Sequence, residues 1–187
     1  ATATATASQK AKYQVEDNEL LLGFYRRVLF DPVLRLVPDS MLPNAVSLIG
    51  VLCSITGVAL IMLGSKGFIA GYLIAAVLFF GYLTADNIDG PLARRSGQTS
   101  RLGELLDHGL DGISSGCMLI GAGVLLSLDS HWFFALAGVG ALTFLLAMWE
   151  QHVTGTLVIP AISGTEAVTI LAGLCLLAFF GENPAWL

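Results

Sequence analysis

The sequence predicts an all-α protein: a polytopic bundle of transmembrane helices preceded by an amphipathic helix at the membrane interface. Composition is the first observation, because 55% of the 187 residues are apolar and only 12% are charged, about half the charged fraction of a soluble domain. The second is that the apolar residues form five long, continuous stretches. A net charge of −5 with nine Lys and Arg also excludes the basic face that nucleic acids require.

The N-terminal residues divide into two predicted parts. Residues 1–13 begin with alternating Ala and Thr, and we expect a disordered or vector-derived leader. Residues 14–40 are predicted to form an interfacial amphipathic helix, bent at Pro32. Its apolar residues recur at helical spacing, while charged residues such as Arg26 and Asp31 occupy other faces.

Residues 41–187 are predicted to form the transmembrane domain. Five apolar stretches approach or reach the roughly 20 residues that a helix needs to cross a bilayer: 46–63, 68–85, 105–128, 132–149 and 161–180. Because these stretches are continuous rather than alternating, they favour helices over the strands of a β-barrel. The sequence therefore predicts five visible spans.

Basic residues give the predicted orientation. Five Lys and Arg precede the first span and three lie between the second and third, whereas the opposite side has only Lys66 in its short loops. Under the positive-inside rule, the N-terminus and the loop containing Arg94, Arg95 and Arg101 face the cytoplasm.

Acidic residues at the ends of the second and third spans form the candidate site. Asp86 and Asp89 are three residues apart, and Asp107 and Asp111 are four apart, so each pair lies on one helix face. Glu104 and His108 fall on the same face of the third helix as Asp107 and Asp111. Ionisable residues near a membrane need a functional explanation because they are costly to bury.

Carboxylate oxygens at this density predict a site for divalent cations. Several carboxylates cannot all stay ionised without a compensating cation, and oxygen ligands suit Mg²⁺ or Mn²⁺ better than zinc or copper. Arg94 follows the first pair and can bind a phosphate, and Gly90 and Gly103 leave room for a substrate. Carboxylates, divalent metal and Arg are the groups used in phosphoryl transfer.

The same residues resemble the signature of the CDP-alcohol phosphotransferase family. Residues 86–94 (DNIDGPLAR) and, eight residues later, 103–111 (GELLDHGLD) meet every fixed position of D-x-x-D-G-x-x-A-R-(x8)-G-x-x-x-D-x-x-x-D. The resemblance implies an integral membrane enzyme with a six-helix core, a site for two Mg²⁺ or Mn²⁺ ions, and a homodimeric assembly.

The resemblance also implies roles for individual residues. The metal ligands would be Asp86, Asp89, Asp107 and Asp111. The residues that seat the CDP moiety would be Asn44, Asp86, Gly90, Arg94 and Gly103. The base that accepts the proton of the attacking hydroxyl would be Asp111, the usual candidate in the family, or His108, whose ordinary pKa of about 6.5 suits that task.

Further motifs are similar to the choline and ethanolamine phosphotransferase branch. Residues 103–109 (GELLDHG), 149–156 (WEQHVTGT) and 164–166 (GTE) carry the likeness. It implies transfer of phosphocholine or phosphoethanolamine from a CDP-alcohol to diacylglycerol, with release of CMP. Glu104 and Glu150 are the acids that we expect to receive the positive headgroup. The enzyme would lie in the endoplasmic reticulum or Golgi of a eukaryote, or the inner membrane of a bacterium, with its site facing the cytoplasm.

Two functional alternatives remain open from the sequence. One is a transferase that takes CDP-diacylglycerol as donor and a small polar alcohol as acceptor. The other is a membrane protein that transports cations through the carboxylate cluster. The expected sixth helix is also missing from the visible spans, so either the chain is truncated at its C-terminus or a partner chain completes the bundle.

Overall fold

The structure, a computed structural model, describes residues 14–181, so the predicted leader lies outside the described residues. Within that range, the side chains outside the description are those of Gln14, Val15, Arg101, Leu102, Glu104, Leu105, Asp107, His108 and Leu157. The elements, in chain order, are β1 (Gln14–Asp17), α1 (Leu22–Tyr25), the π-helix η1 (Arg26–Phe30), α2 (Asp31–Leu36), α3 (Pro43–Gly64), α4 (Ala70–Arg95), α5 (Arg101–Leu125), α6 (Ser130–Thr154), β2 (Thr156–Ile159) and α7 (Gly164–Gly181).

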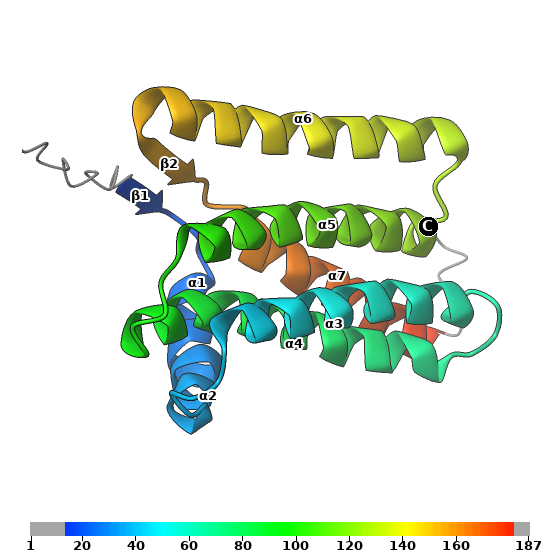
Figure 1. Ribbon diagram of the computed structural model, residues 1–187. Coiled ribbons are helices and arrows are strands. Elements are labelled where there is room, and N and C mark those ends of the chain that lie inside the picture. Colours follow the sequence, from blue (N-terminus) through cyan, green and yellow to red (C-terminus); the bar gives the residue numbers. More distant parts are fainter. Residues whose placement is uncertain (1–13, 182–187) are drawn as a thin grey trace, which may run out of the picture.

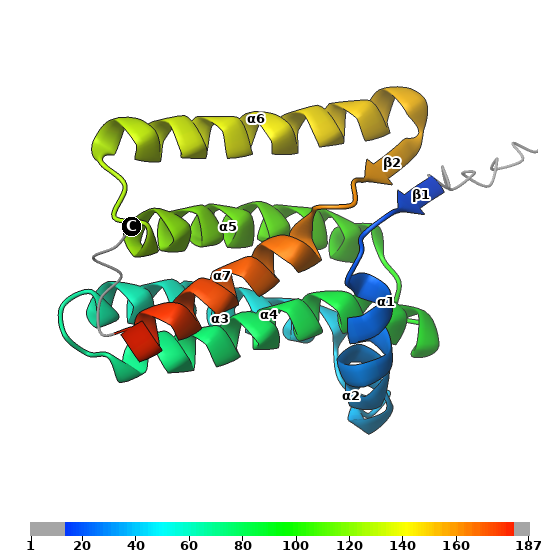
Figure 2. The ribbon, with the colours of Figure 1, turned by 180° about the vertical axis from the view of Figure 1, so that it is seen from behind.

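The helical bundle confirms the predicted fold class. Helices α3 to α7 coincide with the five predicted spans and lie roughly lengthwise beside one another (Figures 1 and 2). In the described part of the chain, four helices are long and apolar enough to cross a membrane, namely α3, α4, α6 and α7. The apolar part of α5 is the shorter segment Gly109–Leu125, because its first turns carry the acidic motif.

Helix α4 continues well beyond the apolar stretch that predicted it. The apolar run ends at Ala85, but the helix reaches Arg95 and includes Pro91. Because proline has no N–H, the carbonyl of Asn87 receives no helical hydrogen bond from residue 91. The ten additional residues add about 15 Å of helix, and they place Asp86 and Asp89 on a continuous helical scaffold.

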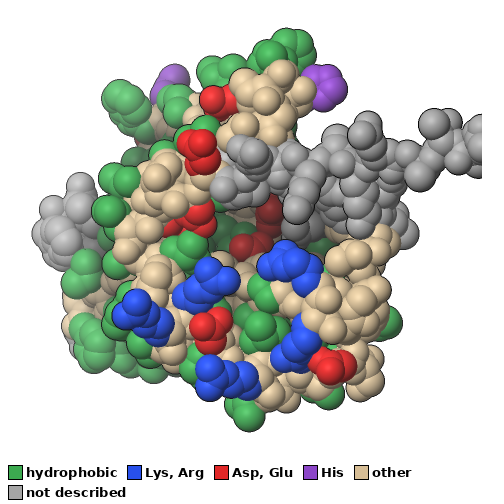
Figure 3. Space-filling model, turned by 90° about the vertical axis from the view of Figure 1, so that its left-hand side faces the viewer, with side chains coloured by type: hydrophobic (Ala, Val, Ile, Leu, Met, Phe, Trp, Pro, Cys, Tyr) green, Lys and Arg blue, Asp and Glu red, His purple; other side chains and the backbone are tan. Residues whose placement is uncertain are grey.

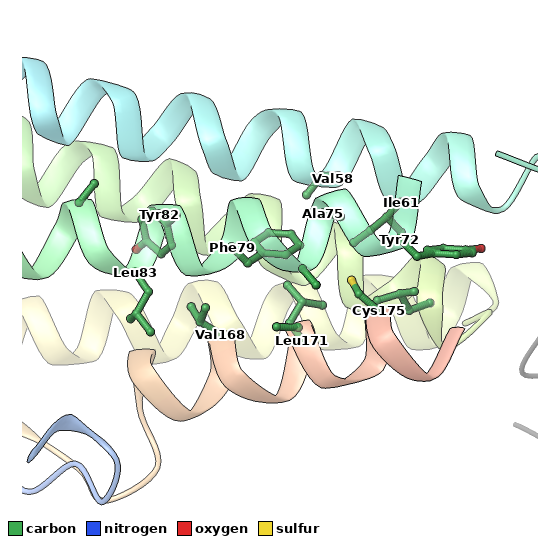
Figure 4. Close-up of a cluster of buried hydrophobic side chains, with 14 of the residues drawn as sticks. Val58, Ile61, Tyr72, Ala75, Phe79, Tyr82, Leu83, Val168, Leu171 and Cys175 are labelled. Carbon is green, nitrogen blue, oxygen red and sulfur yellow. The ribbon is translucent and has the colours of Figure 1, made fainter. Parts of the chain in front are cut away.

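The core lies around α4, which packs against α3 on one side and α7 on the other. Figure 4 shows this apolar cluster, in which Ile61, Phe79 and Cys175 are fully buried. Glycine in α3 permits the close approach: a Cβ at Gly57 would lie 3.1 Å from the Phe79 ring. Small residues at such contacts let helices associate in lipid, where the hydrophobic effect between helices is absent.

Helix α6 is the least buried part of the bundle. None of its side chains is buried, and it packs on the outer side of α5, away from α3 and α4 (Figure 1). It is capped by Gly155, whose φ of +71° is the left-handed conformation typical of the residue that ends a helix. The chain then passes directly into β2.

The N-terminal arm, residues 14–36, differs from the single helix predicted over 14–40. It begins with β1, which pairs in parallel with β2, and its helical part runs only from residue 22 to residue 36. The π-turn η1 precedes Pro32, which has no N–H for the carbonyl of Val28. The helical part of the arm crosses the end of the bundle instead of following its axis (Figure 2). Strand β1 was not predicted because it has only four residues and pairs with a segment about 140 residues away, so no local periodicity marks it.

Candidate functional site

Polar and charged side chains gather at one end of the bundle. Helices α3, α5 and α7 begin at this end, α4 and α6 finish there, and the N-terminal arm crosses it. Figure 3 views this end: Lys and Arg side chains lie together on one side of a hollow, and acidic side chains lie in it. Of the Lys and Arg residues whose side chains are described, all except Lys66 belong to the arm or to the end of α4. The structure therefore places the predicted site and the basic residues together.

A small cavity of about 10 Å³ lies between α3, α4 and α5 at this end. This is room for roughly one water-sized particle. Three of the predicted site residues line it: Asp86 and Asp89 from α4 and Asp111 from α5. Its other lining residues are Ser47, Gly50, Val51, Tyr82 and Leu110. Acids from two different helices therefore line the same cavity.

Asp89 is the most buried of the three carboxylates, with 6% of its surface exposed. Its Oδ2 accepts a hydrogen bond from the Ser47 hydroxyl at 2.5 Å, and its Oδ1 accepts one from the Gly90 amide at 2.5 Å. The Ser47 hydroxyl also lies 3.3 Å from the Pro43 carbonyl. Hydrogen bonds to a charged acceptor are stronger than neutral ones, so Ser47 fixes the orientation of this carboxylate.

Besides Asp86, the residues predicted to seat a nucleotide lie in two pairs. A Cβ at Gly103 would approach the Asn44 side-chain oxygen to 3.2 Å, so α5 begins close to the first turn of α3. A Cβ at Gly90 would lie 3.4 Å from the Arg94 guanidinium, which therefore folds back over Gly90. The absence of side chains at these two glycines keeps Asn44 and Arg94 close to the helix backbones.

The structure does not describe the side chains of three predicted site residues. Glu104, Asp107 and His108 belong to α5, but their side chains lie outside the described residues. Their backbone positions put them on the first two turns of the helix that also carries Asp111. Their predicted roles stay predictions.

The donor chemistry of the cavity fits a hard divalent cation. Among the described side chains, no three of the type His, Cys, Asp or Glu come close enough together to hold a metal ion. The fourth predicted ligand, Asp107, falls outside that description. Three carboxylates nevertheless line one small cavity, and all of their donors are oxygen atoms of the kind that Mg²⁺ and Mn²⁺ prefer.

Glu150, the second acid predicted to receive a headgroup, stands apart from the cavity. It lies in the last two turns of α6, where its side chain is exposed, and it is not among the residues that line the cavity. The adjacent pair of Trp149 and His152 has its rings 6.4 Å apart. Glu150 is therefore at the correct end of the bundle without contributing to the carboxylate site.

Two polar residues that line the cavity, Ser47 and Tyr82, were not among the predicted site residues. Ser47 lies on α3, three residues after Asn44, and its role depends on a contact with a residue 42 positions away. Tyr82 precedes Asp86 by four residues and Asp89 by seven, so all three share a face of α4. Helical spacing could have identified Tyr82, whereas the Ser47 contact needed the tertiary structure.

The Ser47–Asp89 hydrogen bond gives a first testable prediction. Ser47→Ala should weaken the apparent affinity for Mn²⁺ by about tenfold or more, since hydrogen bonds to charged groups contribute roughly 1.5–3 kcal/mol. Ser47→Thr keeps the hydroxyl and should retain most of the affinity. Thermal stabilisation of the purified protein by increasing Mn²⁺ measures both variants. Equal affinities for the alanine variant and the original protein would contradict a positioning role for Ser47.

Comparison with protein families gives one match over most of the chain. Residues 40–186 match the family model described as CDP-alcohol phosphatidyltransferase. This region includes α3 to α7 and the whole carboxylate site.

Curated relatives agree with this match. The chain is 35% identical over 173 residues to cholinephosphotransferase 1 of Mus musculus, covering 84% of this chain and 44% of that protein. It is 32% identical over 162 residues to cholinephosphotransferase 1 of Homo sapiens, covering 82% and 40%. It is 30% identical over 175 residues to choline/ethanolaminephosphotransferase 2 of Arabidopsis thaliana, covering 88% and 44%. The chain thus spans less than half the length of these relatives.

Proposed function

Because the chain belongs to the CDP-alcohol phosphatidyltransferase family, we propose that it forms the catalytic part of a phospholipid-synthesis enzyme in a membrane. The reaction is transfer of phosphocholine or phosphoethanolamine from the CDP-alcohol to diacylglycerol. The convergence of Asp86, Asp89 and Asp111 on one cavity is the observation that carries the proposal. The names of the relatives support the choice of choline or ethanolamine as headgroup.

The proposed chemistry assigns each group a limited task. The hydroxyl oxygen of diacylglycerol attacks the phosphorus that bears the choline or ethanolamine, and the bond from that phosphorus to the CMP oxygen breaks. Divalent cations held by Asp86, Asp89, Asp107 and Asp111 would neutralise the charge of the pyrophosphate. Arg94, which lies over Gly90, pairs with a phosphate oxygen.

The proton of the attacking hydroxyl requires an acceptor, for which the chain offers two candidates. Asp111 lines the cavity, and His108 lies one turn earlier on α5. An Asp111 carboxylate that binds a metal ion has its oxygen atoms committed to that ion, which favours His108. Asn44 and Gly103 lie close together at the starts of α3 and α5, where they are suited to hold the nucleotide.

The N-terminal arm is proposed to lie in the membrane interface. Leu20, Phe24 and Val28 recur every four residues and are each at least 60% exposed. Large apolar side chains in a row, next to the exposed Arg26 and Arg27, match the pattern of an interfacial helix. This position would put the carboxylate site at the level of the lipid headgroups, facing the cytoplasm. The eukaryotic origin of the relatives supports the endoplasmic reticulum or Golgi as its location, and the homodimer stays a prediction.

An assay of CMP release tests the proposed activity. The purified protein in lipid vesicles should release CMP from CDP-choline or CDP-ethanolamine when diacylglycerol and Mg²⁺ or Mn²⁺ are present. Release that instead required CDP-diacylglycerol and a small polar alcohol would assign the enzyme to the other donor class. Family membership argues against the alternative of cation transport, and the absence of any CMP release with either donor class would reopen it.

Glu150 gives a prediction about the headgroup. Glu150→Gln should raise the KM for CDP-choline more than it lowers kcat, because a charge that contacts the headgroup stabilises substrate and transition state alike. Gln151→Glu, a change at the neighbouring position, provides a control with the opposite change in charge. Initial rates over a range of CDP-choline concentrations give both constants. An unchanged KM for Glu150→Gln would exclude Glu150 from headgroup binding.

A further inference from the structure

The N-terminal arm and the start of α7 exchange hydrogen bonds through two carboxylates. Glu19, in the turn before α1, accepts hydrogen bonds from the Thr165 amide at 3.0 Å and the Thr165 hydroxyl at 2.7 Å. Glu166, in the first turn of α7, accepts one from the Leu21 amide of the arm at 2.8 Å and one from the Ser163 amide at 3.1 Å. Each carboxylate therefore satisfies backbone donors of the other segment.

Two of the residues that make these hydrogen bonds are largely shielded from water. Glu166 is only 6% exposed and Thr165 only 2%, so their polar groups have little access to water. A buried charge persists only where hydrogen bonds compensate its lost hydration, and amides at the start of a helix lack partners within the helix. Removing one carboxylate therefore leaves buried donors of the opposite segment without an acceptor.

Further contacts extend the connection in both directions. The Tyr25 hydroxyl lies 3.1 Å from the Thr169 hydroxyl, one turn further along α7. On the other side, β1 pairs with β2 in parallel, and the Asn18 amide donates to the Ile159 carbonyl at 3.2 Å. The arm is thus joined to the whole segment from β2 to the second turn of α7.

This segment also holds the end of α6. Because α6 buries none of its side chains, its packing gives it little stability of its own, and β2 follows it after the single residue Gly155. We propose that Glu19 and Glu166 form a reciprocal latch that fastens the N-terminal arm to α7. The fastened arm holds β2 in place and, through β2, the end of α6 that carries Glu150. The latch couples the interfacial arm to the least buried helix of the bundle.

Hydrogen–deuterium exchange of the purified protein in detergent tests the latch without depending on catalysis. Glu19→Gln should speed amide exchange about tenfold or more in residues 14–25, in β2 and in the last turn of α6, because the loss of a charge-assisted hydrogen bond weakens the whole connection. Exchange in α3 and α4 should stay unchanged. Glu16→Gln, which removes an exposed carboxylate in β1, is the matched control and should leave all of these rates as they are.

The decisive comparison is between the single variants of Glu19 and Glu166 and the double variant. If the two carboxylates act as one unit, Glu19→Gln also frees the Leu21 amide, which it does not contact, and the double variant with Glu166→Gln exchanges no faster than either single variant. If each substitution affects only the amides that its own carboxylate binds, the latch is overturned. Because Glu19 is only partly buried, its variant avoids the folding risk of replacing Glu166. Exchange at the end of α6 that is equal in Glu19→Gln and the original protein would also overturn the proposal.

Discussion

Asp89→Asn should reduce transfer at least a hundredfold while leaving the helical bundle intact. Asp89 is the most buried of the carboxylates that line the cavity, and one electrostatic contact to the transition state contributes about 3 kcal/mol or more. Asp86→Asn and Asp107→Asn should have similar effects. CMP release from CDP-choline in the presence of diacylglycerol and Mn²⁺ measures the loss.

Thermal denaturation separates loss of metal from loss of fold. Without divalent cations, Asp89→Asn should melt at the same temperature as the original protein or higher, because three carboxylates around one cavity repel one another. Added Mn²⁺ should stabilise the original protein and have little effect on the variant. Asp31→Asn is the control: its carboxylate lies outside the cavity, 3.9 Å from Arg26. Near-normal turnover of folded Asp89→Asn would refute the metal assignment.

His108→Ala should lower kcat by about 10²–10⁴-fold if His108 accepts the proton of the attacking hydroxyl. A base works only in its neutral form, so the rate should rise with pH through the ordinary histidine range near 6.5. The variant should lose that rise, and its affinity for the CDP-alcohol should change little. The pH profile of kcat and a direct binding measurement test both statements.

A histidine at the opposite end of the bundle provides the control for this experiment. His131 lies in the first turn of α6, and its side chain is 98% exposed; His131→Ala should leave the rate and its pH dependence unchanged. If His108→Ala abolishes binding of the CDP-alcohol instead, His108 is a binding residue. The role of base then passes to Asp111.

The sequence was sufficient to predict the helices that depend on apolar length. Each of α3 to α7 contains a long, mostly apolar stretch, so hydropathy located it even where acidic residues interrupt the start of the stretch, as in α5 and α7. Hydropathy did not indicate that α4 continues to Arg95, because charged residues and Pro91 interrupt the apolar residues after Ala85. It also missed β1 and β2, whose pairing joins residues 14–17 to 156–159. No local pattern encodes a contact over that separation.

In the candidate site too, the sequence predicted relations between nearby residues but not contacts between residues far apart in the chain. Helical spacing was enough to predict that Asp86 and Asp89 share a face, and the family signature pointed to their partners on α5. The contact between Ser47 and Asp89 joins residues more than 40 positions apart. The contacts of Glu19 with Thr165 and of Glu166 with Leu21 join residues still farther apart. Such contacts follow from how the helices pack, which the order of polar and apolar residues does not specify.

The lack of burial along α6 has a consequence for how the family can diversify. Substitutions at exposed positions usually change stability little, so α6 can accept new side chains at low cost provided that they remain compatible with lipid. Asp86 and Asp89, by contrast, sit on α4, whose neighbours on both sides are tightly packed. If Glu150 binds the headgroup as proposed, donor preference can be redesigned through the end of α6 while the carboxylates on α4 stay the same.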